Sequence, residues 1–183
     1  MKASTAEKLA GVLKWIVTAV FILMLALIIF VPYLTGIRAM LAWTYSIKPD
    51  FSFKAVFEAW KVLFGGGDLW RTVLAWFLLF CGVCAAVILW QARTVLKNLS
   101  AGRLFVRGNV TAVVRAGLFC FFIAAAAAVR LVINLVIAKS AAPIVSYATF
   151  FIPVFVIAGL ILLIAGALFA RAAELKEDND LVI

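Results

Sequence analysis

The sequence contains no histidine and few acidic side chains. Among its 183 residues, 8 are Asp or Glu and 17 are Lys or Arg, which gives a formal net charge of +9. The absence of histidine excludes Ser-His and Cys-His nucleophile pairs, imidazole metal sites and His-ligated haem. The sequence also lacks a phosphate-binding loop, a catalytic serine motif and a cluster of metal ligands. We therefore expect no catalytic, cofactor-binding or metal-binding residues, and a protein that is not an enzyme.

Charged residues are scarce, and apolar residues dominate. Charged side chains make up 14% of the chain and hydrophobic residues 68%. A soluble domain of this size cannot hide so much apolar surface, because its outer shell must be largely polar. Lipid offers no hydrogen-bond partner for an open sheet edge, so the membrane-spanning segments must be helices. We therefore predict a single integral membrane domain of the all-α class over residues 1–183.

Four apolar runs are long enough to be transmembrane helices. A helix rises about 1.5 Å per residue, so roughly 20 apolar residues cross about 30 Å of hydrocarbon. The predicted spans of this four-helix bundle cover residues about 15–35, 69–90, 110–138 and 143–170. Small residues at Gly159, Gly166 and Ala170 are expected to let the fourth helix pack closely, with the alanines at 124–128 as the matching surface.

The distribution of Lys and Arg predicts the orientation. The loop 91–109, between the second and third spans, has four cations and no acid: Arg93, Lys97, Arg103 and Arg107. Because positive loops stay on the cytoplasmic side, we predict that this loop, the N-terminus and the tail 171–183 are cytoplasmic. We interpret these cations as topology signals and contacts for membrane lipids, and we expect no direct binding to nucleic acid.

The segment 36–68, between the first and second spans, is too long for a plain connection. Residues 49–52 resemble a helix start, and the glycines 65–67 resemble a helix end. Between them, apolar residues recur at spacings of three and four: Phe53, Val56, Phe57, Trp60 and Leu63. This pattern predicts an extracytoplasmic amphipathic helix. It either lies on the membrane surface and caps the bundle, or forms a lid over a pocket between the spans.

Cys81 and Cys84 form a C-x-x-C pair inside the second span. In soluble proteins this spacing is typical of a redox pair or of half a zinc site. Near mid-bilayer, however, thiolate formation is disfavoured, and the chain contains no second pair to relay electrons. The alternative is that these cysteines are small apolar residues beside Gly82, where another helix can approach.

Arg130 is the most suggestive charge, because an ionisable residue within a span is a candidate for function. None of the predicted spans contains an acid to pair with it. Arg130 is expected in the outer half of the third span, with Asn134 one turn later on the same face. The side chain either extends to the headgroups or makes structural bonds, or it binds an anionic lipid or ligand together with Asn134.

The region around loop 91–109 resembles the DUF2975 family of small bacterial membrane proteins of unknown function. The resemblance rests on a short motif, followed by Gly117: Leu96, Leu99, Gly102, Phe105, Asn109, Val114, Arg115 and Ala116. The acidic ending 173–183, which closes on three apolar residues, is similar too. The resemblance implies four spans, a multi-pass protein of the bacterial cytoplasmic membrane, and a cytosolic helix-turn-helix transcriptional regulator as a partner.

Two roles are open for the motif residues. Gly102 is expected in a turn, Phe105 tucked under the bundle, Asn109 as the cap of the third helix, and Arg115 as an interface anchor. Alternatively, the loop and tail form one docking face for a partner. The loop would supply its four cations, and the tail would supply four acids: Glu174, Glu177, Asp178 and Asp180. The leading hypothesis is a regulatory or scaffold protein, and the alternative is a small transporter or a lipid- or ligand-binding protein.

Overall fold

The structure is a computed structural model, and it describes residues 5–35, 52–65, 69–103, 106–145 and 147–181. The described residues form α-helices and one short 3-10 helix, which confirms the all-α class. In chain order the elements are α1 (Thr5–Leu34), α3 (Phe53–Phe64), α4 (Leu69–Ser100), α5 (Arg107–Ala138), η1 (Ala142–Val145) and α6 (Tyr147–Leu181).

Four of these helices are long and apolar enough to cross a membrane, as predicted. The candidate spans are Lys8–Leu34, Arg71–Ser100, Arg107–Ala138 and Ala142–Leu175. Several helices extend past the apolar runs, since α4 continues to Ser100 and α5 starts at Arg107. Most of the predicted loop 91–109 is therefore helical.

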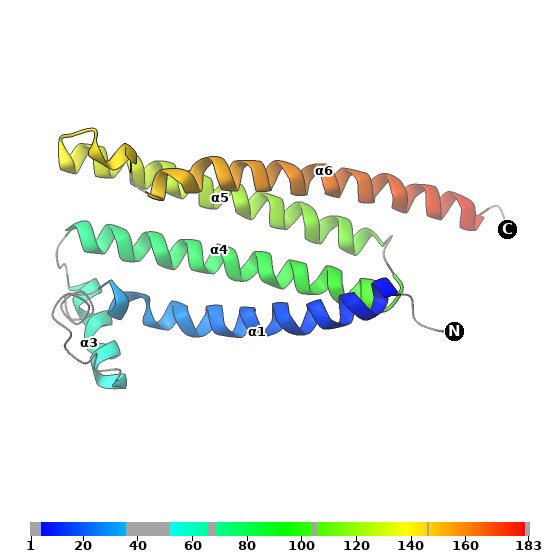
Figure 1. The fold of residues 1–183 in the computed structure, drawn as a ribbon, viewed down its shortest axis with the longest axis horizontal. Helices are drawn as coiled ribbons and strands as arrows, with labels where there is room; N and C mark the ends of the chain where they lie inside the picture. Colours follow the sequence, from blue (N-terminus) through cyan, green and yellow to red (C-terminus); the bar gives the residue numbers. More distant parts are fainter. Residues whose placement is uncertain (1–4, 36–51, 66–68, 104–105, 146, 182–183) are drawn as a thin grey trace.

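The four long helices run antiparallel in an open row. Figure 1 shows α1, α4, α5 and α6 side by side, each in extended contact with its neighbour in the row. Within the part of the chain that the structure describes, α4 has no extended contact with α6, and α1 has none with α5 or α6. The bundle is thus open, and both of its broad faces are available to lipid.

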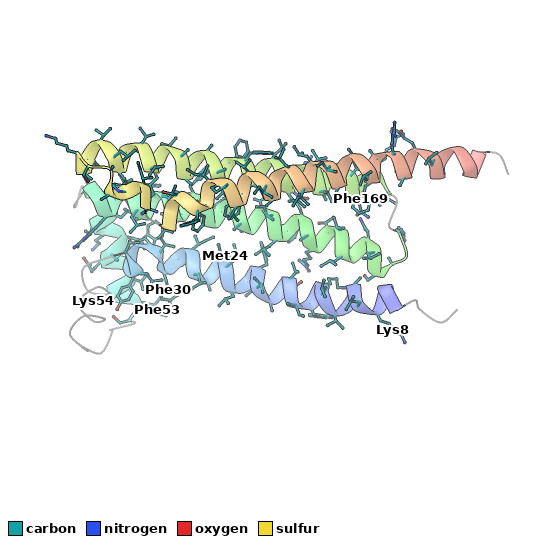
Figure 2. The ribbon with its side chains drawn as sticks, turned by 45° about the horizontal axis from the view of Figure 1, so that its top comes forward. Lys8, Met24, Phe30, Phe53, Lys54 and Phe169 are labelled. Carbon is teal, nitrogen blue, oxygen red and sulfur yellow. The ribbon has the colours of Figure 1, made fainter. Side chains whose placement is uncertain are left out.

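Different parts of the chain lie at the two ends of the row. Both chain ends and the connection between α4 and α5 lie at one end, which we call the terminal end, and α3 lies at the other. Figure 2 shows the same separation in its labelled side chains, with Lys8 of α1 far from Phe53 and Lys54 of α3.

The contact between α5 and α6 depends on glycine. A Cβ atom at Gly159 would lie 3.1 Å from the carbonyl oxygen of Gly117, and one at Gly166 would lie 2.7 Å from Cγ2 of Val114. The predicted close packing of α6 is therefore confirmed at Gly159 and Gly166. The α5 residues that come closest to these two positions are Val114, Gly117 and Phe121, on one face of the helix.

Helix α3 begins and ends where its sequence predicts. The Ser52 hydroxyl accepts a hydrogen bond from the Ala55 N–H at 3.2 Å, which caps the first turn. At the other end, the Gly65 N–H donates to the Lys61 carbonyl at 2.8 Å.

Helix α3 packs between the ends of α1 and α4. Leu63 joins a small core with Ala75 and Leu79 of α4. The indole N–H of Trp60 donates to the Ile29 carbonyl of α1 at 3.1 Å. Pro32 lies inside this last part of α1, where its missing N–H and its ring loosen the preceding turn and leave carbonyls accessible. These contacts hold α3 as a cap on the row.

The buried face of α3 differs from the predicted one. Val56 and Leu63 are buried, but Phe53 is 90% exposed and Phe57 is 62% exposed. Their place in the core is taken by Ala55, which is buried. Helix α3 therefore meets the row along a narrow ridge, and its two N-terminal phenylalanines face the surroundings.

Candidate functional site

Arg130 is buried between helices in the half of the row that carries α3. It lies eight residues before the end of α5 at Ala138, which is about 12 Å along the helix axis. Only 7% of its surface is exposed. The guanidinium Cζ lies 4.7 Å from the centre of the Phe77 ring of α4. The side chain therefore packs inward against α4 and is not exposed on the surface of the row.

The Phe77 ring is the one interaction of Arg130 with the residues that the structure describes, apart from an electrostatic influence on Cys81. No hydrogen bond or ion pair joins the guanidinium to a described residue. A desolvated cation–π contact contributes about 2 kcal/mol. The ring faces the cation, but the five guanidinium N–H donors have no acceptor among the described residues.

Asn134 shares this buried face of α5. It is 5% exposed, and the described residues offer no hydrogen-bond partner for its side-chain amide. An unsatisfied buried amide costs about 1–3 kcal/mol. Arg130 and Asn134 are thus two buried polar groups, one turn apart, and neither has a hydrogen-bond partner within the part of the chain that the structure describes.

Aromatic rings connect Arg130 to the outside of the row. Phe77 is 8% exposed and meets the ring of Phe151 of α6 edge-on, with 6.5 Å between centroids. Phe151 stacks on Phe155 at 5.7 Å and is 37% exposed. A single layer of aromatic side chains therefore leads from the guanidinium face to the exposed surface of α6. Sequence patterns do not reveal this layer, because the rings belong to two other helices.

The cysteines of the C-x-x-C pair are free thiols. Cys84 is buried and Cys81 is half-buried. Between them, a Cβ at Gly82 would lie 2.9 Å from Cγ1 of Ile28, so α1 approaches α4 closely here. Among the residues that are described, no group of three or more metal-ligating side chains is found. This geometry favours the packing interpretation of the cysteine pair.

At the terminal end, Gly102 ends α4 in a Schellman motif. Its φ of 71° is left-handed. The Gly102 N–H donates to the Leu99 carbonyl at 3.0 Å, and the Arg103 N–H donates to the Asn98 carbonyl at 2.9 Å. Glycine tolerates this conformation without a Cβ clash. Gly102 thus has the turn role that the sequence suggests.

Asn109 ties α5 to the end of α4 and is fully buried. Its Oδ1 accepts a hydrogen bond from Nδ2 of Asn98 at 2.7 Å, and its own Nδ2 donates to the Arg103 carbonyl at 3.2 Å. The expected cap is wrong in detail, because Val106 is the N-cap of α5 and provides no side-chain bond. Asn109 lies three residues further on and bridges two helices instead.

The residues of the predicted docking face are only partly brought together. Lys97, Arg103 and Arg107 are exposed near the α4–α5 connection, and Arg93 lies over the Trp90 ring at 5.3 Å. Glu174 is exposed on α6. Phe105 and the side chains of Glu177, Asp178 and Asp180 lie outside the described residues. The loop–tail ion pairs therefore stay a prediction.

Arg115 differs from Arg130 although both lie on α5. Arg115 is exposed near the terminal end, as an interface anchor should be. It therefore provides a matched control for experiments on Arg130.

Comparison with known proteins gives one match. A model of the DUF2975 family, described as a protein of unknown function, matches residues 41–183. No curated protein and no solved structure matches the chain.

Proposed function

Because this chain belongs to the DUF2975 family, whose description contains no activity, we propose its function from the geometry of Arg130. The protein is a non-enzymatic, multi-pass membrane protein that binds an anionic group inside its membrane-spanning region. Arg130 supplies the charge, and Asn134 supplies a neutral amide one turn away. This is the lipid- or ligand-binding class that the sequence analysis kept as an alternative.

The observation that carries this proposal is a buried guanidinium that has no hydrogen-bond or ion-pair partner among the described residues. Arg130 is 7% exposed, and no described residue accepts a hydrogen bond from it. An oxyanion would accept two parallel N–H bonds from the guanidinium fork and neutralise its charge. Since helices α4 and α5 contain no Asp or Glu, the counter-charge must come from outside these helices.

The proposed location is the bacterial cytoplasmic membrane, with both termini in the cytoplasm. The cations near the α4–α5 connection support this orientation. The Arg130 site and helix α3 then belong to the outer half of the membrane. With α5 centred on the bilayer, Arg130 lies about 11 Å from the middle of a hydrocarbon layer about 15 Å thick on each side.

Thermal unfolding in an uncharged detergent tests the proposal. A panel of water-soluble and lipophilic oxyanions is added to the wild-type protein, to Arg130→Gln and to Arg115→Gln. A ligand that binds only the folded state raises the midpoint temperature. We expect at least one anion to stabilise the wild type and Arg115→Gln but not Arg130→Gln. Equal stabilisation of all three proteins, or of none, would overturn the proposal.

A second candidate function is the regulatory or scaffold role. One observation favours it: both termini and the α4–α5 connection lie at the same end of the row (Figure 1), so a single partner can contact all three. The partner would be a cytosolic transcriptional regulator held by the loop cations and the acidic tail. Pull-down from cells with the full chain, and with the tail removed after Ala173, tests this. Unchanged recovery of the regulator without the tail would exclude tail docking.

A further inference from the structure

The arrangement of the four long helices in an open row limits the directions from which a ligand can reach Arg130. Along the axis, the chain closes the end of α5 itself: Lys139 caps the helix, and η1 packs against it. From the side, no helix covers the junction, because α4 and α6 make no extended contact within the described residues. On this side, the Phe77 ring lies over the guanidinium, and Phe151 of α6 contacts the Phe77 ring. A ligand that approaches from the side comes out of the bilayer and must itself be amphiphilic.

The groups around Arg130 follow the order of the groups in a phospholipid. Asn134 lies nearest the end of α5, Arg130 is one turn deeper, and the stacked rings of Phe151 and Phe155 provide apolar surface on α6. A lipid in the same leaflet has its polar headgroup outermost, its phosphate next and its acyl chains innermost. The phosphate would then meet Arg130, and the headgroup would meet Asn134.

The site also discriminates between headgroups. Helices α4 and α5 contain no carboxylate that would pair with an ammonium group, and the acids of α6 begin only at Glu174, near its C-terminal end. The amide of Asn134 both donates and accepts hydrogen bonds, which suits hydroxyl groups. These features favour an anionic lipid with a hydroxylated headgroup over a zwitterionic one.

We propose that Arg130 and Asn134 bind the phosphate and the hydroxylated headgroup of an anionic phospholipid that enters sideways past Phe77 and Phe151. This inference rests on the proposed function, because it names the class of anion. The lipid is an amphiphile of the phosphatidylglycerol type, and the bilayer is its source.

Native mass spectrometry of the detergent-solubilised full chain tests this inference. Three compounds are compared: phosphatidylglycerol, phosphatidylcholine, and glycerol phosphate, which has the anionic headgroup without acyl chains. We expect one retained phosphatidylglycerol per chain. Arg130→Gln should weaken the binding of phosphatidylglycerol by about tenfold or more, because charge-assisted hydrogen bonds are lost. Arg115→Gln should retain the lipid. Arg130→Lys keeps the charge and loses the fork, so it should bind with intermediate affinity.

The outcomes separate the two proposals. Binding of glycerol phosphate as strong as that of phosphatidylglycerol, both dependent on Arg130, would overturn the lipid assignment and leave anion binding intact. Retention of phosphatidylglycerol by Arg130→Gln at the wild-type level would overturn both the lipid assignment and the proposal that Arg130 binds an anion. A further variant, Asn134→Leu, should weaken the binding of phosphatidylglycerol more than the binding of phosphatidic acid, which lacks the headgroup hydroxyls. If the binding of the two lipids were weakened equally, the proposed contact between Asn134 and the headgroup would be overturned.

Discussion

The Arg130 guanidinium lies over the ring of Phe77, with 4.7 Å between Cζ and the ring centre. This contact joins α5 to α4 at the level where Phe77 also meets Phe151 of α6. One charged side chain thus lies where three of the four long helices meet. The ring faces the cation but accepts no conventional hydrogen bond, so the guanidinium N–H groups are still able to bind the proposed anion.

The Asn98–Asn109 bond should make the two residues interdependent. Asn109→Ala leaves the Asn98 amide and the Arg103 carbonyl without their partner, so we expect a loss of about 2 kcal/mol in the free energy of unfolding. The double variant with Asn98→Ala should lose less than the sum of the single losses, by about 1 kcal/mol. Reversible unfolding in mixed micelles measures all four proteins, and strict additivity would contradict the direct bond.

The α5–α6 contact should be sensitive to one methyl group. Gly166→Ala places a Cβ 2.7 Å from Val114 Cγ2, so overpacking should cost about 1–3 kcal/mol. Gly108→Ala is the control on α5, because a Cβ there has nothing within 4 Å. Adding Val114→Ala to Gly166→Ala should restore part of the loss. Equal thermal stability of Gly166→Ala and Gly108→Ala would argue against this packing.

The hydrogen bond from Trp60 to Ile29 should contribute to holding α3 on α1. Trp60→Phe keeps an aromatic ring and removes the N–H donor, so the expected loss is about 1 kcal/mol. Trp15→Phe, at a position of α1 that is 73% exposed, is the matched control. Hydrogen exchange should become faster in residues 53–64 of Trp60→Phe only. Unchanged exchange in α3 would show that its packing does not need this bond.

The proposed orientation has a direct chemical test. A single cysteine at Lys54 of α3 and another at Lys97 of α4 would each be exposed in the folded protein. In intact cells, a membrane-impermeant maleimide should label Lys54→Cys at once and Lys97→Cys only after permeabilisation. The wild-type protein, with its three free cysteines in the spans, provides the background. The reverse pattern would place the termini outside.

Much of the fold follows from patterns within single segments of the sequence. Long apolar runs predict the four long helices, and Ser52 and Gly65 mark the ends of α3, because each signal depends on nearby residues only. The same holds for the turn at Gly102. The continuation of α4 and α5 into the predicted loop was missed, since helix propensity persists after an apolar run ends and charged residues do not stop a helix.

Features that depend on neighbouring helices were not predictable in the same way. Both the burial of Arg130 and the exposure of Phe53 follow from how α4, α5 and α1 are placed in space. Periodicity identified Arg130 and Asn134 as one face of a helix, but not the Phe77 ring opposite. The Asn109 bridge likewise depends on Asn98, eleven residues away in another helix.

The most direct test of the account is the sign of the stability change caused by Arg130→Gln in two lipid environments. In bilayer discs made only of a zwitterionic lipid, the guanidinium has no counter-ion among the described residues or the lipids, so Arg130→Gln should unfold at the same temperature as the wild type or higher. In discs that contain phosphatidylglycerol, the wild type should gain stability and Arg130→Gln should not, which makes the wild type the more stable protein. An equal loss of stability by Arg130→Gln in both kinds of disc would contradict the account, because the arginine would then serve the fold and not an anion.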